Sequence, residues 1–207
     1  FGILEQHAQP ALPVSVRNVE AALTGVQLQP GASATSKGIV GRLALDDDAT
    51  LAEWFFRVTR HPYDNKLDQQ FSREHDRYPR EGEIPLLMDS AKDSNFKTSP
   101  LQLPRAHGDK TFELIGVPLK KPGFYVVEFA SDRLGATLHG EQKPYYVSSS
   151  AIVTNMAVHL KQGRESTLVW VTRFDNAQPV ANAAVRASTC EARTLWEGKT
   201  DGQGMAH

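Results

Sequence analysis

The feature that most constrains the fold of this chain is the run Gly123–Ser131, which is apolar at both sets of alternating positions. One set consists of Tyr125, Val127 and Phe129, and the other consists of Phe124, Val126 and Ala130. A strand carries this pattern when both of its faces are covered by other parts of the protein. The run therefore predicts a central strand of a β-sandwich, entered through a turn at Lys120–Gly123.

A second strand, Ala151–Leu160, is predicted shortly after the first. The segment between them, Tyr145–Ser150, is interpreted as a short join that leaves little room for a flexible linker. We therefore predict a domain boundary here. The first domain covers residues 12–148, after a tail at residues 1–11 left from a preceding module, and the second domain covers residues 149–207.

Further segments have the alternation and the flanking turn residues that are typical of strands. They are Leu12–Glu20, Gly38–Leu45 and Thr111–Val117 in the first domain, and Leu168–Val171, Val180–Ala187 and Thr194–Glu197 in the second. The second domain then holds about four of the roughly seven strands of a sandwich. The expected fold class is all-β, with tandem β-sandwich domains of which the second is incomplete. We expect its open face to pair with another copy or to be covered within a longer chain.

One helix is predicted among these strands, beginning at Thr50. Thr50 and Glu53 form a capping box, in which each side chain satisfies a backbone N–H of the other residue. An apolar stripe at helical spacing follows, formed by Leu51, Trp54, Phe55 and Val58. Pro62 ends the helix. We expect a helical insertion near residues 49–85, whose charged part, Tyr63–Arg80, is either a partner surface or a solvated decoration.

Composition excludes several classes of protein. The chain has 23 Lys and Arg against 24 Asp and Glu, so it lacks the basic surface of a nucleic-acid binder. No run approaches the roughly 18 apolar residues that span a bilayer, and residues 1–5 are not a signal peptide. A single cysteine, Cys190, cannot form an internal disulfide or a cysteine-based zinc cluster. The absence of an initial Met and the stop just after a turn lead us to expect a fragment of a longer protein.

Three segments and their order carry a resemblance to a known family. They are Leu119–Glu128, Tyr146–His159, and a third made up of Leu168–Arg173, Gln178–Val185 and Leu195–Gly204 with its Gln-Pro-Val-Ala and Thr-Asp-Gly-Gln-Gly turns. Together they closely resemble consecutive macroglobulin-like domains of the bacterial alpha-2-macroglobulins. The resemblance is strongest over residues 120–204.

The resemblance implies a function, since members of this family are large periplasmic protease traps that are usually lipid-anchored. A protease cuts a bait region, the trap changes shape, and in many members a Cys-x-x-Gln thioester captures the protease. The macroglobulin-like domains are the non-catalytic scaffold. The resemblance therefore implies no enzyme activity and no cofactor, with proteases, neighbouring macroglobulin-like domains and other periplasmic proteins as partners of the full-length protein. It also implies a periplasmic location, with an inner-membrane lipid anchor outside this segment.

Cys190 and the acidic run at Asp46–Asp48 are the first candidate sites. The thioester needs a glutamine three residues after the cysteine, but Arg193 stands there and cannot form the acyl bond, so Cys190 is interpreted as an inert thiol. The acidic run could bind calcium. It lacks the spacing of an EF-hand loop, and its charge is better explained by the positive end of the helix that follows.

The remaining candidates are His, Ser and Trp side chains. The histidines have no zinc-binding spacing; they include His61, His75, His107, His139, His159 and His207. The Glu74-His75-Asp76 sequence is interpreted as a solvated polar face, and Ser148–Ser150 lacks the context of a nucleophile. Trp54, Trp170 and Trp196 could form a carbohydrate platform, but we predict that they are core residues. No catalytic, cofactor-binding or metal-ligating residue is predicted.

Two other functions stay open. An immunoglobulin-like adhesion module of a periplasmic or surface protein would use exposed aromatic side chains to bind glycan or protein. An enzyme is the weakest alternative, because no set of base, nucleophile and oxyanion donors is visible in the sequence.

Overall fold

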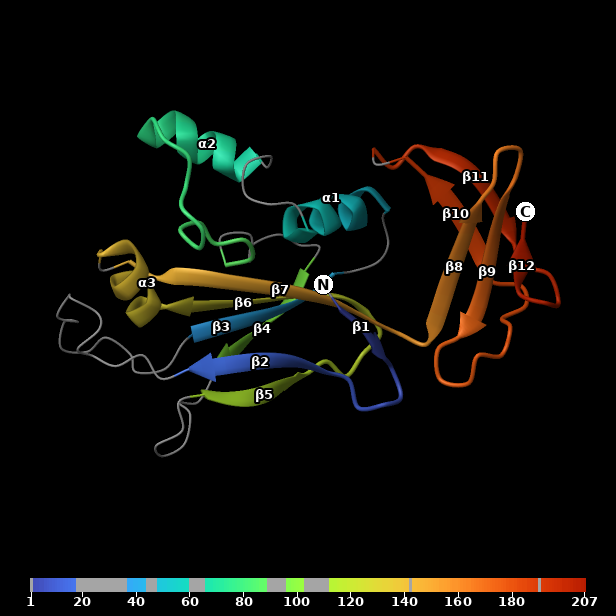
Figure 1. The fold of residues 1–207 in the computed structure, drawn as a ribbon, viewed down its shortest axis with the longest axis horizontal. Helices are drawn as coiled ribbons and strands as arrows, with labels where there is room; N and C mark the ends of the chain where they lie inside the picture. The colour runs from blue at the N-terminus through green and yellow to red at the C-terminus, as the bar shows by residue number, and fades with distance from the viewer. Residues whose placement is uncertain are drawn as a thin grey trace.

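The structure is a computed structural model that describes residues 2–17, 37–43, 48–59, 66–88, 96–102, 112–141, 143–189 and 191–207. These residues form mostly strands arranged in several sheets, with a few short helices, as the all-β prediction requires. Figure 1 shows an N-terminal sandwich with helices above it, followed by a separate set of C-terminal sheets.

A five-stranded sheet forms the centre of the N-terminal sandwich, with strand order β1-β7-β6-β3-β4. These strands are β1 (Gly2–Glu5), β3 (Lys37–Leu43), β4 (Phe96–Gln102), β6 (Gly123–Ser131) and β7 (Tyr145–Thr154). Strand β1 pairs parallel with β7, and the other pairs are antiparallel. Strand β6 is central and buried over most of its length, which confirms the prediction from its two apolar faces.

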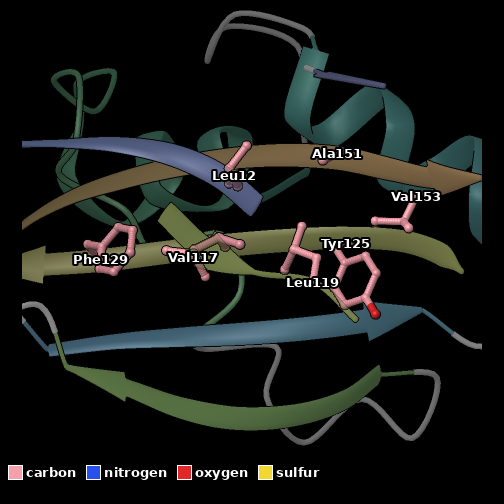
Figure 2. Packing of buried hydrophobic residues seen from close by; sticks show 8 residues of the cluster. Leu12, Val117, Leu119, Tyr125, Phe129, Ala151 and Val153 are labelled. Carbon is pink, nitrogen blue, oxygen red and sulfur yellow. The ribbon is translucent and has the colours of Figure 1, made fainter. Parts of the chain in front are cut away.

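A two-stranded sheet covers one face of this central sheet. It pairs β2 (Ala11–Arg17) with β5 (Phe112–Pro118) in antiparallel register. The core between the two sheets is built from one alternating set of β6 together with residues of its neighbours: Leu12, Val117, Leu119, Tyr125, Val127, Phe129, Ala151 and Val153. Figure 2 shows these side chains between the ribbons.

The opposite face of the central sheet is covered by α1 (Asp48–Thr59) and by the segment at residues 84–88. Their core contains Leu43, Trp54, Leu87, Phe124 and Val126, so the second alternating set of β6 is buried here. Helix α2 (Lys66–His75) lies within the predicted helical insertion. Helix α3 (Asp132–His139) lies between β6 and β7 and packs against β7.

The C-terminal sheets hold the remaining strands (Figure 1). A three-stranded sheet has the order β12-β9-β8, formed by β8 (Met156–Gln162), β9 (Thr167–Arg173) and β12 (Met205–Ala206). A two-stranded sheet pairs β10 (Ala184–Ser188) with β11 (Thr194–Lys199). Among the described residues, no helix has the length and hydropathy needed to cross a membrane.

The join predicted at residues 145–150 was wrong, because these residues belong to β7. Their pairing with β6 runs from Tyr145 opposite Ser131 to Val153 opposite Gly123, so β7 passes through the predicted boundary at residues 148 and 149. The single strand predicted at residues 151–160 is instead interrupted at Asn155, where β7 ends and β8 begins. The division into domains stays a prediction.

Four elements were not expected from the sequence. One is β12, which pairs with β9 after the last turn, where the following strand was expected to be missing. The tail at residues 1–11 contains β1, which gains its strand structure from pairing with Ala151–Thr154 of β7. Strand β4 pairs with β3. Helix α3 is capped by the Ser131 hydroxyl, which accepts from the Leu134 N–H, and by Gly140, whose φ of 69° suits a left-handed C-cap.

Helix α1 begins at Asp48, two residues before the predicted start, and ends at Thr59. Thr50 therefore lies inside the first turn, and the capping box was wrong. Leu51, Trp54 and Val58 face the core as predicted, but Phe55 is exposed because it lies at the edge of the stripe.

Candidate functional site

The candidate functional site of this chain is the joint between the N-terminal sandwich and the C-terminal sheets. One residue, Asn155, separates β7 from β8. Its carbonyl accepts from the Phe174 N–H at 2.8 Å, and its side-chain oxygen accepts from the Asp175 N–H at 3.3 Å. The Met156 N–H donates to the Thr154 hydroxyl at 3.0 Å. The joint is therefore short and hydrogen-bonded on both sides of Asn155.

A second connection lies away from this joint. The guanidinium of Arg186 on β10 donates to Asp48 at 2.8 Å, in the first turn of α1, and to Glu197 on β11 at 2.6 Å. Asp48 belongs to the helical cover of the N-terminal sandwich, whereas Arg186 and Glu197 belong to the C-terminal sheets. The two parts thus meet at the joint and at this ion pair.

Within the N-terminal sandwich, Glu128 of β6 is fully buried and holds the covering segment in place. Its carboxylate accepts from the backbone N–H groups of Leu86, Leu87 and Met88 at 2.5, 2.9 and 2.7 Å. The Ser148 hydroxyl also donates to it, at 2.8 Å. A buried carboxylate is tolerated when its oxygens are satisfied in this way. Glu128 therefore has a structural role.

The loop before this segment is anchored by Arg77 and Glu83. The Arg77 guanidinium donates two hydrogen bonds to the Glu83 carboxylate, at 2.8 and 2.5 Å. These bonds hold the pKa of Glu83 down at about 2, with a smaller contribution from the Arg80 N–H. Gly82 has φ of 72°, and the Tyr145 ring occupies the space where its Cβ would be, so a side chain at this position would clash.

The depressed pKa of Glu83 predicts a pH dependence of stability. A carboxyl with a lower pKa in the folded state stabilises the fold above its unfolded pKa, near 4.5, and that stability is lost as the pH falls toward about 2. Because the Arg77 side chain is 38% exposed, we discount the shift for solvent screening and expect about 1–2 kcal/mol.

Acid unfolding monitored by circular dichroism, with Glu83→Gln as the variant, measures this contribution. The variant should be less stable than the parent at neutral pH and should approach it at pH values near 2. Glu141→Gln is the control, since Glu141 is an exposed carboxylate whose ion pairs, with Lys143 at 3.1 Å and Arg80 at 3.9 Å, lie in solvent and contribute little to stability. Equal acid unfolding of the Glu83→Gln variant and the parent would contradict the prediction.

The structure places some of the predicted candidate residues and not others. Cys190, Asp46 and Asp47 lie outside the described residues. Asp48 is described, and its carboxylate binds Arg186. Among the described residues, no group of three or more His, Cys, Asp or Glu side chains could hold a metal ion.

The described histidines are dispersed over the structure. His75 stacks on Phe71 with ring centroids 4.0 Å apart, and His139 lies 3.1 Å from the Glu81 carbonyl oxygen. His159 lies beside Trp170 on the neighbouring strand. His207 is exposed at the last position, whereas His61 and His107 lie outside the described residues.

The serine segment and the tryptophans differ in their burial. Ser148 binds Glu128, and the buried hydroxyl of Ser150 has no hydrogen-bond partner among the residues that the structure describes. Trp54 is 1% exposed, as predicted for a core residue. The core prediction was wrong for Trp170 and Trp196, which are 40% and 37% exposed. Their strands have two faces with apolar residues, and the sequence pattern does not show which face is covered.

Both tryptophans nevertheless have local contacts. The Trp170 indole N–H donates to the Gln203 carbonyl at 3.1 Å. The Trp196 ring covers Gly198, so that a Cβ at this glycine would overlap the ring. The exposed apolar surface of this part also includes Met156, Val158 and Leu160, which alternate along β8.

The paired sheets of the N-terminal part, followed directly by further sheets, define the class of macroglobulin-like β-sandwich proteins. Residues 153–207 match the family described as bacterial alpha-2-macroglobulin MG3 domain. This C-terminal region is therefore similar to the MG3 domain of bacterial alpha-2-macroglobulins, which confirms the resemblance predicted from the sequence. No curated protein sequence matches the chain.

A solved structure agrees with this fold. Native alpha-2-macroglobulin from Escherichia coli, in a crystal structure spanning domains NIE-MG1, aligns with a TM-score of 0.54 at 12% sequence identity. The alignment covers 95% of this chain and 76% of that chain. A structure of the same protein spanning MG0-NIE-MG1 aligns with a TM-score of 0.49 at 13% identity and covers 98% of this chain and 55% of that one. At this identity the NIE-MG1 structure supports the fold alone.

Proposed function

We propose that this chain is a scaffold segment of a bacterial alpha-2-macroglobulin-like protein that traps proteases, and that the segment itself is not an enzyme. The observation that carries the proposal is the match of residues 153–207 to the MG3 domain family. The NIE-MG1 structure supports it at the level of the fold. The endopeptidase-inhibitor activity would belong to the full-length protein.

The hydrogen bonds and ion pairs within the N-terminal sandwich fit the role of a scaffold. Glu128, the most deeply buried carboxylate described, is occupied by four hydrogen bonds, three of which fasten a covering segment to the central sheet. The Arg77–Glu83 pair anchors the loop that leads to this segment. Such contacts stiffen a sandwich that has to transmit a change of shape.

The proposal includes the partners and the location. Proteases would be bound by the full-length protein, and neighbouring macroglobulin-like domains would contact this segment, with other periplasmic proteins as further partners. We place the protein in the periplasm, held at the inner membrane by a lipid anchor outside this segment. The charged stretch at residues 63–80 remains a candidate partner surface.

A substrate-size assay tests the trap. The full-length protein carrying this segment is incubated with an endopeptidase, and the cleavage of a large protein substrate is compared with that of a short peptide. We expect cleavage of the large substrate to fall while peptide cleavage continues, because a trapped protease keeps its active site but is sterically enclosed. Unchanged cleavage of the large substrate would overturn the proposal.

A second candidate function, glycan binding by an immunoglobulin-like adhesion module, is favoured by the exposure of Trp170 and Trp196. Exposed aromatic rings can stack on sugars. Binding of the chain to a glycan array, lost in Trp170→Ala, would support this function, and a chain that binds no glycan would exclude it.

A further inference from the structure

The β10–β11 hairpin orients the side chain of Arg186, which also contacts α1. It pairs with Glu197 in the register of β10 and β11, and its Nε lies 2.6 Å from the Glu197 carboxylate. A cross-strand pair of opposite charge orients the guanidinium, which leaves its Nη1 free to donate elsewhere. Nη1 donates to Asp48 at 2.8 Å.

The position of Asp48 on α1 also favours the ion pair with Arg186. It lies in the first turn of α1, where the helix dipole favours a carboxylate. The helix is fixed to the central sheet through Trp54, which is buried in the core beneath it. Figure 1 shows the start of α1 beside the β10–β11 hairpin. The ion pair therefore joins two rigid elements that are 138 residues apart in the sequence.

The ion pair between Arg186 and Asp48 lies away from the joint at Asn155, so it can affect the angle between the two parts. The chain passes between the two parts through Asn155, whose hydrogen bonds hold it to Phe174 and Asp175 of the C-terminal part, and this single connection leaves rotation about the backbone bonds on its N-terminal side. A second contact away from that joint restricts the rotation. We propose that Asp48, Arg186 and Glu197 form a clasp that sets the angle between the N-terminal sandwich and the C-terminal sheets.

The ion pairs of the clasp can break while both parts of the chain stay folded. The side chains of Arg186, Asp48 and Glu197 are 51%, 43% and 57% exposed, so salt screens their attraction. An exposed ion pair contributes about 1 kcal/mol or less, which corresponds to a change of up to about fivefold in an equilibrium. The angle is thus biased by the clasp and can be shifted by modest forces. This inference does not depend on protease trapping.

A distance measurement on the 207-residue chain tests the clasp. Cys190→Ser removes the native thiol, and Lys120→Cys and Lys161→Cys introduce spin labels at exposed positions of the N-terminal sandwich and of β8. Double electron–electron resonance then gives the distribution of distances between the two parts. Asp48→Asn and Arg186→Gln are compared with the labelled parent, singly and together.

We expect the population with the clasped distance to fall by up to about fivefold relative to the other distances in each single variant. The double variant should match the single variants, since both remove the same contact. Raising the salt concentration from about 0.1 M to about 1 M, which shortens the Debye length from about 10 Å to about 3 Å, should broaden the parent distribution in the same way.

Glu53→Gln is the matched control. It also removes one exposed carboxylate from α1 and breaks an ion pair of 2.8 Å, but its partner, Arg57, lies on the same helix. Its distance distribution should equal that of the parent. The clasp is overturned if Arg186→Gln leaves the distribution unchanged, even where Asp48→Asn alters it, because the effect of Asp48 would then act through the helix.

Discussion

Replacing Glu128 by Ala should lower the free energy of unfolding of the N-terminal sandwich by about 3–5 kcal/mol. The substitution leaves the backbone N–H groups of residues 86–88 without an acceptor, and the loss at a buried group such as that of Leu87 costs about 1–3 kcal/mol. Water can reach the half-buried N–H groups at the ends of this segment, so we expect less than the full sum. The segment at residues 84–88 should detach from the sheet before the sandwich unfolds.

Urea unfolding followed by tryptophan fluorescence measures this loss. Trp54 packs in the same core as Leu87, directly beside the segment that Glu128 holds. A background with Trp170→Phe and Trp196→Phe leaves Trp54 as the reporter of the N-terminal sandwich, since the chain has three tryptophans.

Two serine variants are the controls for Glu128. Ser148→Ala removes a single hydrogen bond to the carboxylate and should cost about 1 kcal/mol. Ser150→Ala removes a buried hydroxyl without a partner in the described part of the chain, so it should be neutral or slightly stabilising. A loss of less than about 1 kcal/mol in Glu128→Ala would contradict the role of the carboxylate, because one ordinary hydrogen bond contributes that much.

Around Glu128, the sequence predicted the two faces of the strand but not the hydrogen-bond partners of the carboxylate. The alternation along β6 predicted both apolar faces correctly, because side-chain direction in a strand follows from residue spacing alone. A lone carboxylate in such a strand was a visible signal of a buried, satisfied charge. Three of its four partners could not be predicted, since they are backbone groups 40 to 42 residues away in a segment without regular pattern.

The end of β7 and the ion pair of the clasp also could not be predicted from the sequence. The sequence predicted a junction at residues 148 and 149, but β7 continues to Thr154, because β6 pairs with it as far as Val153 and β1 pairs with Thr154. Nothing local marks this end of the strand. The Arg186–Asp48 pair depends on the relative placement of two elements, which no sequence spacing encodes. Similarly, the exposure of Trp170 depends on which face of β9 is covered.

Helix α3 was missed because Gly135 stands in its middle, and a helix interior normally disfavours glycine by about 1 kcal/mol relative to alanine. The signals that were available lie at the ends of the helix, with Ser131 as N-cap and Gly140 as C-cap. The glycine is required by tertiary packing. The carbonyl oxygen of Lys143, which precedes Pro144, occupies the space where a Cβ at residue 135 would lie.

Gly135→Ala should therefore destabilise the N-terminal sandwich by about 2–3 kcal/mol, although alanine is the better helix former. The gain in helix propensity is about 0.5–1 kcal/mol, whereas overpacking costs about 1–3 kcal/mol and occasionally more. The neighbour that must move is backbone just before a proline, which relaxes less readily than a flexible side chain. The same urea unfolding, followed through Trp54, measures the loss.

Gly140→Ala separates this steric effect from the effect of backbone conformation. Gly140 has φ of 69° and no atom within 4 Å of the position of an added Cβ, so only the left-handed conformation is penalised, by about 1 kcal/mol. Gly135→Ala should be the more damaging variant even though its backbone is helical. If Gly135→Ala instead stabilised the protein, as at an exposed helix position, α3 would not pack against residues 143–144, and the connection between β6 and β7 would be looser than the structure shows.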